Sequence, residues 1–176
     1  MAMTKPHHPA EKDEITKEGD KSDIYVIKPR GLNIVWGKDE RYWKIPDKGC
    51  TGPLELIQVS WLEVTSSVDS LESGKAYELT FDVELTSDAF GWKDIQVFLM
   101  AKVGKKGKYK WTKVKLNQDQ SNKKVTIPEN SKLSIGVVPE DSTDNTLHFG
   151  LYEVWSGKWK GGLKIHNAKV TPATAP

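Results

Sequence analysis

Two tryptophans, Trp36 and Trp43, stand seven positions apart, and the polar stretch Gly-Lys-Asp-Glu follows the first of them. Gly37 tolerates positive φ and Asp39 can bond its own backbone, so the segment predicts a turn that brings both indoles to one rim. Flat rings beside short polar side chains suit a ligand with one apolar face and many hydroxyl groups, which describes a sugar. Tyr42 would add a further contact. The alternative, that Trp36 or Trp43 fills the core, stays open.

Glu153 is a second candidate, because it continues the alternation of apolar residues at positions 147, 149 and 151. A carboxylate on a core-facing row is costly unless it is paired or lies near the rim. One interpretation is a structural salt bridge to Lys158 or Arg41. The other is an acceptor for the hydroxyl or acetamido groups of a sugar. Trp155 and Trp159 flank the next loop and either cover the core or extend the site; we expect Trp159 in the core.

Residues 102–115 contain seven lysines and no acid, with Tyr109 and Trp111 between them. Basic residues around aromatic rings can bind RNA, and a lysine cluster can act as a nuclear import signal. The residues that would serve either role are Lys105, Lys106, Lys108 and Lys110. The other interpretation, which we favour, is a solvated hairpin that turns at residues 104–107 and carries lysines on an exposed edge.

The sequence offers little for catalysis or metal binding. Two of the four histidines lie in the N-terminal stretch and two stand alone, without Cys or His at ligand spacing. There is no Gly-rich phosphate loop and no G-x-S-x-G elbow. A glycosidase needs two carboxylates, and Glu153 with Asp39 or Glu40 is a weak pair. We therefore expect no metal, no cofactor and no enzymatic activity.

The elements that must position these residues read as strands. Residues 77–85 are apolar at every odd position, which is typical of a half-buried strand, and residues 95–103 and 147–151 repeat this parity. The stretch 54–64 is apolar on both faces and predicts one strand covered on both sides. Further strands are expected at residues 24–27, 32–36, 111–116, 125–127, 133–138 and 163–170. Many short strands with regular turn signals predict a β-sandwich or barrel.

Length and composition fit one domain. The 176 residues carry 26 Lys and Arg against 24 Asp and Glu, for a net charge of +2, so bulk charge does not indicate nucleic acid binding. We expect a mobile polar tail at residues 1–22, the folded domain at 23–172 and a short open tail at 173–176. Cys50 is the single cysteine, and no apolar leader or membrane span is visible. These features favour a nucleocytoplasmic location without a signal peptide.

In their order along the chain, several blocks resemble the phloem protein 2 lectins, the Nictaba-like family, and most closely its cucurbit phloem lectin type. The resemblance covers residues 32–172. The blocks that carry it are LNIVW at 32–36, YW at 42–43, LEL at 54–56, VSWLEV at 59–64, YELTF at 77–81, LYEV at 151–154 and KWKGGL at 158–163.

The resemblance implies a jelly-roll-like antiparallel β-sandwich, formed as a non-covalent homodimer. It implies binding of N-acetylglucosamine oligomers and of the chitobiose core of N-glycans on glycoproteins, in the cytoplasm, the phloem sap or the nucleus. The family's site residues fall on Trp36, Trp43 and Glu153. A second acidic residue of the family pattern falls on Thr146, with Asp144 nearby. Some phloem lectins are linked to RNA transport, which keeps RNA as an alternative partner for the lysine run.

Overall fold

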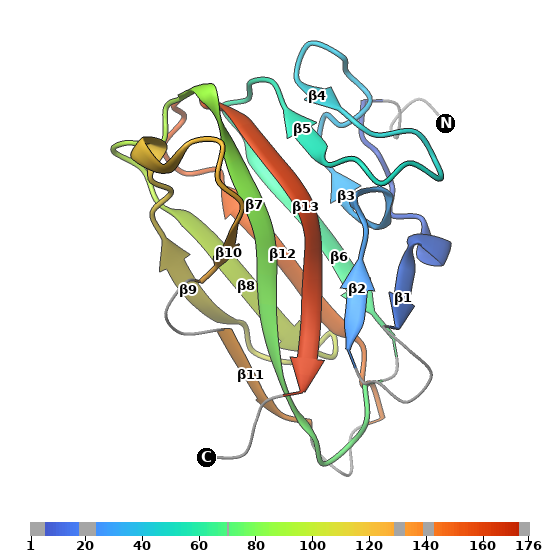
Figure 1. The fold of residues 1–176 in the computed structure, drawn as a ribbon. Helices are drawn as coiled ribbons and strands as arrows, with labels where there is room; N and C mark the ends of the chain where they lie inside the picture. The colour runs from blue at the N-terminus through green and yellow to red at the C-terminus, as the bar shows by residue number, and fades with distance from the viewer. Residues whose placement is uncertain (1–5, 18–23, 70, 129–132, 139–142, 173–176) are drawn as a thin grey trace.

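The computed structural model describes residues 6–17, 24–69, 71–128, 133–138 and 143–172. They form a jelly-roll-like antiparallel β-sandwich of two sheets, in which the chain passes repeatedly from one sheet to the other (Figure 1). Three short 3-10 turns are the only helical elements in these ranges: η2 (Lys12–Glu14), η3 (Pro29–Gly31) and η4 (Gln118–Gln120). No helix in the described part is long and apolar enough to cross a membrane.

The larger sheet is built around two long strands, β7 (Ala76–Phe90) and β13 (Gly161–Pro172), which pair along most of their length. Two strands, β2 (Tyr25–Ile27) and β5 (Leu54–Leu56), pair with β13, and each carries one further strand, β1 (Ile15–Lys17) and β4 (Trp43–Lys44) respectively. The other partners of β7 are β10 (Val125–Ile127) and β11 (Leu133–Val137).

The smaller sheet has five strands in the order β3-β6-β12-β8-β9. Their bounds are β3 (Asn33–Ile34), β6 (Leu62–Val68), β12 (Leu147–Glu153), β8 (Val97–Val103) and β9 (Lys110–Val114). The β8–β9 pair forms the predicted hairpin around residues 104–107, and β9 is the last strand of the sheet.

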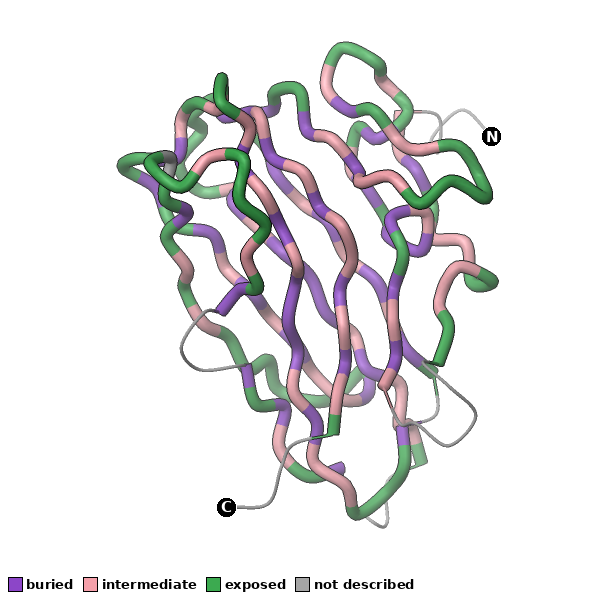
Figure 2. Tube along the Cα trace, viewed as in Figure 1, coloured by how far each residue is buried: buried purple, intermediate pink, exposed green. Residues whose placement is uncertain are grey.

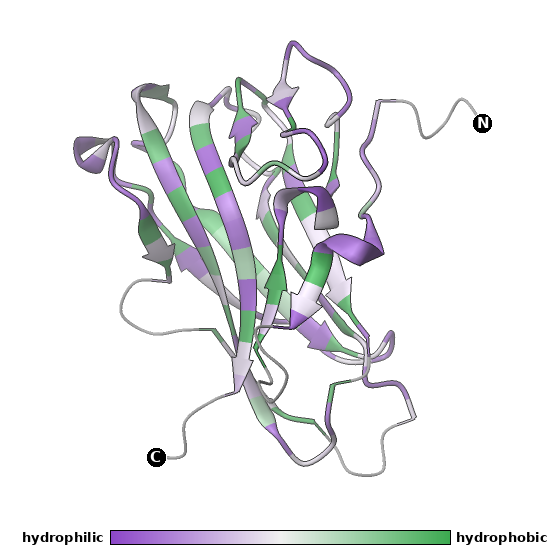
Figure 3. Cartoon of the chain, turned by 45° about the vertical axis from the view of Figure 1, so that its right-hand side comes forward, coloured by the Kyte–Doolittle hydropathy of each residue, from purple (hydrophilic) through white to green (hydrophobic). Residues whose placement is uncertain are grey.

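Alternating side chains from both sheets fill the core. Strand β6 alternates buried and half-buried residues along its whole length, and the same alternation continues along β7 (Figure 2). The bands of hydropathy on the long strands in Figure 3 follow the same period. Phe81 on β7 meets Phe149 on β12 edge to face across the two layers, with ring centroids 6.1 Å apart. The period-2 pattern therefore positions one apolar face of each sheet against the other.

Two predictions about the elements are wrong. The stretch 54–64 is not one strand, because the chain leaves the larger sheet after β5 and enters the smaller sheet at β6. Between them, Val59 makes an isolated bridge with Lys160. The described part of the expected N-terminal tail, residues 6–17, is also not a tail. His8 bridges to Ile34, and β1 pairs with β2.

Polar contacts hold this N-terminal segment, which explains why composition alone missed it. Buried His8 places Nδ1 3.0 Å from the carbonyl oxygen of Leu32, and Ala10 donates its N–H to the side chain of Asn33. Glu11 accepts from Arg30 at 2.8 Å and from Lys48 at 3.3 Å. A segment without apolar periodicity thus becomes ordered because its charged groups meet partners elsewhere in the chain. The outer tail residues, 1–5 and 173–176, lie outside the described part.

Candidate functional site

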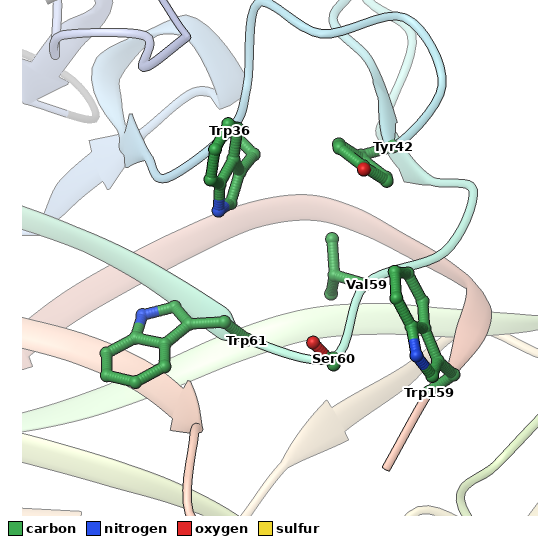
Figure 4. A pocket seen from close by; sticks show the side chains of 6 residues that line it. All are labelled: Trp36, Tyr42, Val59, Ser60, Trp61 and Trp159. Atoms are coloured by element: carbon green, nitrogen blue, oxygen red, sulfur yellow. The ribbon is translucent and has the colours of Figure 1, made fainter. Parts of the chain in front are cut away.

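Four aromatic rings surround an open pocket of about 160 Å³ at one end of the sandwich (Figure 4). The complete lining is Trp36, Tyr42, Val59, Ser60, Trp61 and Trp159. These residues come from three segments that the fold brings together: the turn after β3, the crossing between β5 and β6, and the loop before β13. The predicted convergence of aromatic rings at one rim is therefore present, with a partly different set of rings.

Trp36 sits in a left-handed backbone conformation, with φ of 65°, and its side chain is 40% exposed. The turn that sets this geometry is hydrogen bonded on both sides, since Gly37 N–H reaches Ile34 O at 2.9 Å and Asp39 N–H reaches Trp36 O at 3.1 Å. The Trp36 N–H itself donates to His7 Nδ1 at 2.9 Å. The His7 ring also packs against the Trp36 indole, with centroids 5.6 Å apart.

Tyr42 links the two walls of the pocket. Its ring lies edge to face against Trp36 at 6.0 Å and at a 37° tilt to Trp159 at 6.2 Å. Arg41 places its guanidinium 5.1 Å from the Tyr42 ring on a cation–π contact. The same guanidinium pairs with Asp39 at 2.7 Å, and hydrogen bonding from Arg41 lowers the pKa of the Asp39 carboxyl. These contacts join Trp36, Tyr42 and Trp159 into one cluster of rings.

Trp61 was missed as a pocket residue, because the prediction of one continuous strand over 54–64 gave it no special position. In the structure it immediately precedes β6 and is exposed. Its indole N–H donates to Glu63 at 3.0 Å, and its ring extends away from Tyr42 and Trp159 (Figure 4). The signal in the sequence is a large aromatic residue directly after the polar residues Gln58 and Ser60, where the chain passes between the sheets.

Trp43 does not stack on a ligand as predicted. It is 1% exposed, pairs with Leu56 in the sheet and donates its indole N–H to Val35 O at 3.1 Å. The alternative stated from the sequence, that one of the two tryptophans fills the core, is the correct one for Trp43. It touches a second hollow, which is larger but has no other aromatic side chain.

Glu153 is also inside the protein, at 3% exposed, and does not line the pocket. Its Oε1 accepts from Lys160 Nζ and from Ser156 Oγ, both at 2.6 Å. The structural salt bridge is thus the correct interpretation, but the partner is neither Lys158 nor Arg41. Burial lowers the pKa of Lys160, and the hydrogen bond that Lys160 donates to Glu153 opposes this effect.

Lys160 connects this ion pair to the pocket. Its Nζ also donates to three backbone carbonyl oxygens: Ser60 at 2.5 Å, Glu153 at 3.0 Å and Lys158 at 3.1 Å. Ser60 lines the pocket, and Lys158 precedes Trp159. Glu153 therefore does not line the pocket, and its partner Lys160 bonds the backbone of two segments that do.

Of the remaining predicted residues, only Trp159 lines this pocket. Trp159 is exposed and belongs to the pocket, so its predicted place in the core is wrong, whereas Trp155 points outward and packs on Phe98 with centroids 4.7 Å apart. Lys105, Lys106, Lys108 and Lys110 are exposed on the β8–β9 hairpin. Asp144 accepts backbone hydrogen bonds from Lys105 and Thr146 in that region, away from the pocket. No described group of three or more His, Cys, Asp or Glu residues could hold a metal ion.

A sequence model described as Phloem protein 2 matches residues 22–172. The chain belongs to the phloem protein 2 family. Within it, the chain is 43% identical over 173 residues to Protein PHLOEM PROTEIN 2-LIKE A9 of Arabidopsis thaliana, covering 93% of this chain and 94% of that protein.

Two further similarities are more partial. A protein named Lectin from Luffa acutangula is 36% identical over 78 residues, which are 41% of this chain and 37% of that lectin. Among solved structures, a Family 16 Carbohydrate Binding Module-2 aligns with a TM-score of 0.44 at 10% identity, over 93% of this chain and 96% of that one. The family membership thus rests on the sequence matches.

Proposed function

We propose that this phloem protein 2 family member is a lectin that binds N-acetylglucosamine oligomers in the pocket of Trp36, Tyr42, Trp61 and Trp159. The observation that carries the proposal is the open pocket lined by four aromatic residues, of which Trp36, Tyr42 and Trp159 contact one another. An aromatic face can cover the apolar C–H face of a pyranose, while polar groups at the edge bond its hydroxyls. The Ser60 hydroxyl and the Trp36 indole nitrogen point toward the space between the rings (Figure 4).

The choice of N-acetylglucosamine follows the family resemblance, and the similarity to a relative named Lectin supports a carbohydrate ligand. The pocket is open and each hydrogen bond contributes only about 0.5–1.5 kcal/mol net. We therefore expect modest affinity for a short oligomer. The same family membership favours the phloem sap as the place where the protein meets its glycans.

Calorimetry with chitotriose tests this proposal. Trp36→Ala and Trp159→Ala each remove one wall, and we expect at least a tenfold loss of affinity, since a buried stacking contact contributes about 1 kcal/mol or more beyond its area. Val137→Ala, an exposed apolar substitution on β11, is the matched surface control. Wild-type affinity in both tryptophan variants, with the fold intact by circular dichroism, would refute the pocket.

We further propose that binding occurs without hydrolysis. Of the three carboxylates considered for glycosidase chemistry, Asp39 is paired with Arg41 and Glu153 with Lys160, and Glu40 does not line the pocket. A general acid needs a raised pKa, whereas hydrogen bonding from Arg41 lowers the pKa of Asp39. Chitotetraose should remain intact after prolonged incubation with the protein, as read by chromatography, and the appearance of shorter products would contradict this.

A further inference from the structure

A second group of aromatic rings lies on the outer face of the five-stranded sheet. Phe98 on β8 packs against Trp155 at 4.7 Å and against Trp111 on β9 at 5.6 Å between ring centroids. The two indoles are 61% and 54% exposed, respectively, so each offers a face to solvent while Phe98 holds it in place. Neither indole is used by the pocket, and we call Phe98, Trp111 and Trp155 the outer aromatic cluster.

The strand register connects this cluster to the pocket. Glu63 on β6 lies opposite Tyr152 on β12, and Tyr152 lies opposite Phe98 on β8. At the near end of this row, the pocket residue Trp61 donates its indole N–H to Glu63. A single row of side chains therefore crosses the sheet, from the pocket wall to the outer aromatic cluster.

The middle of the row is polar, and its side chains lie close to the surface of the sheet. Gly150, the next outward position on β12, has no side chain, and a Cβ there would lie 2.8 Å from both Thr65 and the Tyr152 ring. Tyr152 therefore lies over the glycine rather than standing up from the sheet. Burial raises the pKa of Tyr152 to about 12, so its hydroxyl stays protonated and can donate, beside a Glu63 carboxylate that can accept.

We propose that this row is a track for an extended glycan chain, which starts in the pocket and ends on the outer aromatic cluster. The proposal rests on the proposed function and adds the surface over which a longer N-acetylglucosamine chain would run beyond the pocket. Rings at both ends can stack on sugar faces, and the polar groups between them can bond hydroxyls. Continuity with the pocket through Trp61 is what favours a glycan as the occupant.

A second copy of the chain fits this face less well. A twofold contact would place the same patch of both subunits against each other. Lys102 and Lys113 lie outward on this face on either side of Trp111, so like charges would meet across such a contact. RNA would suit the lysines and exposed rings, but it would not explain the neutral-to-acidic centre of the row at Tyr152 and Glu63.

Calorimetry with chito-oligosaccharides of increasing length, from chitobiose to chitohexaose, tests the track. In the wild-type chain, affinity should rise with length. Trp155→Ala and Trp111→Ala should leave chitobiose binding unchanged and weaken chitohexaose binding by about 3- to 10-fold each, as expected for the loss of one stacking contact. Val137→Ala serves again as the surface control.

Several outcomes overturn the track, and they can be told apart from failure of the pocket. Equal affinity of the wild type for all lengths would overturn the track, and so would unchanged chitohexaose binding in both cluster variants. In either case the pocket still stands if Trp36→Ala weakens chitobiose binding. If Trp36→Ala instead binds chitobiose normally, the pocket itself fails. Conversion of a dimer to a monomer by Trp155→Ala in light scattering would assign the face to a second copy. Loss of single-stranded RNA binding in a gel shift, with unaltered length dependence, would assign it to RNA.

Discussion

Trp36 shows how one residue of the site is held in an unfavourable conformation. A non-glycine residue at positive φ costs on the order of 1–3 kcal/mol and persists only where its surroundings fix it. Here the turn bonds of Gly37 and Asp39, together with His7, supply that constraint. Such strained positions cluster at functional sites, and this one presents an indole to the pocket.

The constraint from His7 can be tested directly. His7→Ala removes both the acceptor for the Trp36 N–H and the ring contact, so we expect about 3- to 10-fold weaker chitotriose binding, since one hydrogen bond contributes about 0.5–1.5 kcal/mol. His7→Asn restores a side-chain acceptor without the imidazole and should recover part of the affinity. Calorimetry on the three proteins decides it, and equal affinities would mean that the turn holds Trp36 unaided.

The buried pair of Lys160 and Glu153 makes a second prediction. Removing one partner of a buried ion pair typically costs about 3–5 kcal/mol. We expect Lys160→Met to lower the free energy of unfolding more than Glu153→Gln, because it also leaves three carbonyl oxygens without their donor. Urea unfolding measures both. A Glu153→Gln variant that is folded yet less stable, with unchanged chitotriose affinity, would confirm that Glu153 makes no ligand contact.

At the scale of elements, the N-terminal segment 6–17 supports the site from outside the sandwich. Burial alone would raise the pKa of Glu11, but hydrogen bonds from Arg30, His8 and Lys48 outweigh it and lower the pKa from 4.5 to about 2. A carboxyl whose pKa is depressed in the folded state stabilises that state above its unfolded pKa. This contribution is lost as the pH falls from about 4.5 toward 2.

Glu11→Gln should therefore destabilise the protein at neutral pH and flatten the acid limb of its stability curve. We expect a loss on the order of 1 kcal/mol, because solvent screens a carboxylate that is partly exposed. Urea unfolding over a pH series from neutral to about 2 provides the measurement. If the wild type and the variant lose stability in parallel below pH ~4.5, the Glu11 contacts contribute nothing to folding.

Gly91, just after β7, determines how closely the loop before β13 can approach. It has a φ of 86°, and a Cβ there would collide with the carbonyl oxygen of Trp159 and lie 2.8 Å from Lys160 Cα. Gly91→Ala should therefore both destabilise the fold, by about 1–3 kcal/mol, and displace Trp159, so that chitotriose binding weakens as well. Gly49→Ala, also at positive φ but with open space around it, is the matched control. Urea unfolding and calorimetry are measured on both variants. The Gly49 variant reports the cost of the positive φ alone, and the Gly91 variant adds the steric collision with Trp159 and Lys160.

The strands that the sequence predicts best are those whose two faces differ. Residues 77–85 alternate because one face meets the core and the other meets water, and β7 covers them all. The prediction of one strand over 54–64 was wrong because apolar residues recur on both faces through β5, the crossing and the start of β6, so no change of period marks the passage between sheets. The prediction of a tail over residues 6–17 was wrong because polar and charged contacts with distant residues hold this segment, and these contacts leave no apolar pattern in the sequence.

For the site, the position of Trp36 and the involvement of Tyr42 could be predicted from local residue types. The roles of Trp43 and Glu153 could not be settled, since burial depends on partners brought by other elements. Lys160, which pairs with Glu153, lies beside the equally charged Lys158, and composition does not say which of the two points inward. The places of Trp61 and Trp159 could not be predicted, because they depend on how the segment between β5 and β6 meets the loop before β13 in space.

At the scale of the whole molecule, the core is separate from the two surfaces proposed to bind glycans. Phe81 and Phe149 join the two sheets inside, whereas the pocket and the outer aromatic cluster face solvent. Phe149→Ala should lower the free energy of unfolding by about 3–5 kcal/mol. At temperatures where the variant is still folded, chitotriose affinity should match the wild type. Thermal unfolding and calorimetry test this, and a parallel loss of affinity would show that the core and the pocket are coupled.

His7, which accepts the Trp36 N–H, and His8, which bridges to Ile34 in the strand before that turn, both precede the part of the chain that matches the family, residues 22–172. A change at His7 would therefore alter the support of the Trp36 turn and leave the matched part of the chain unchanged.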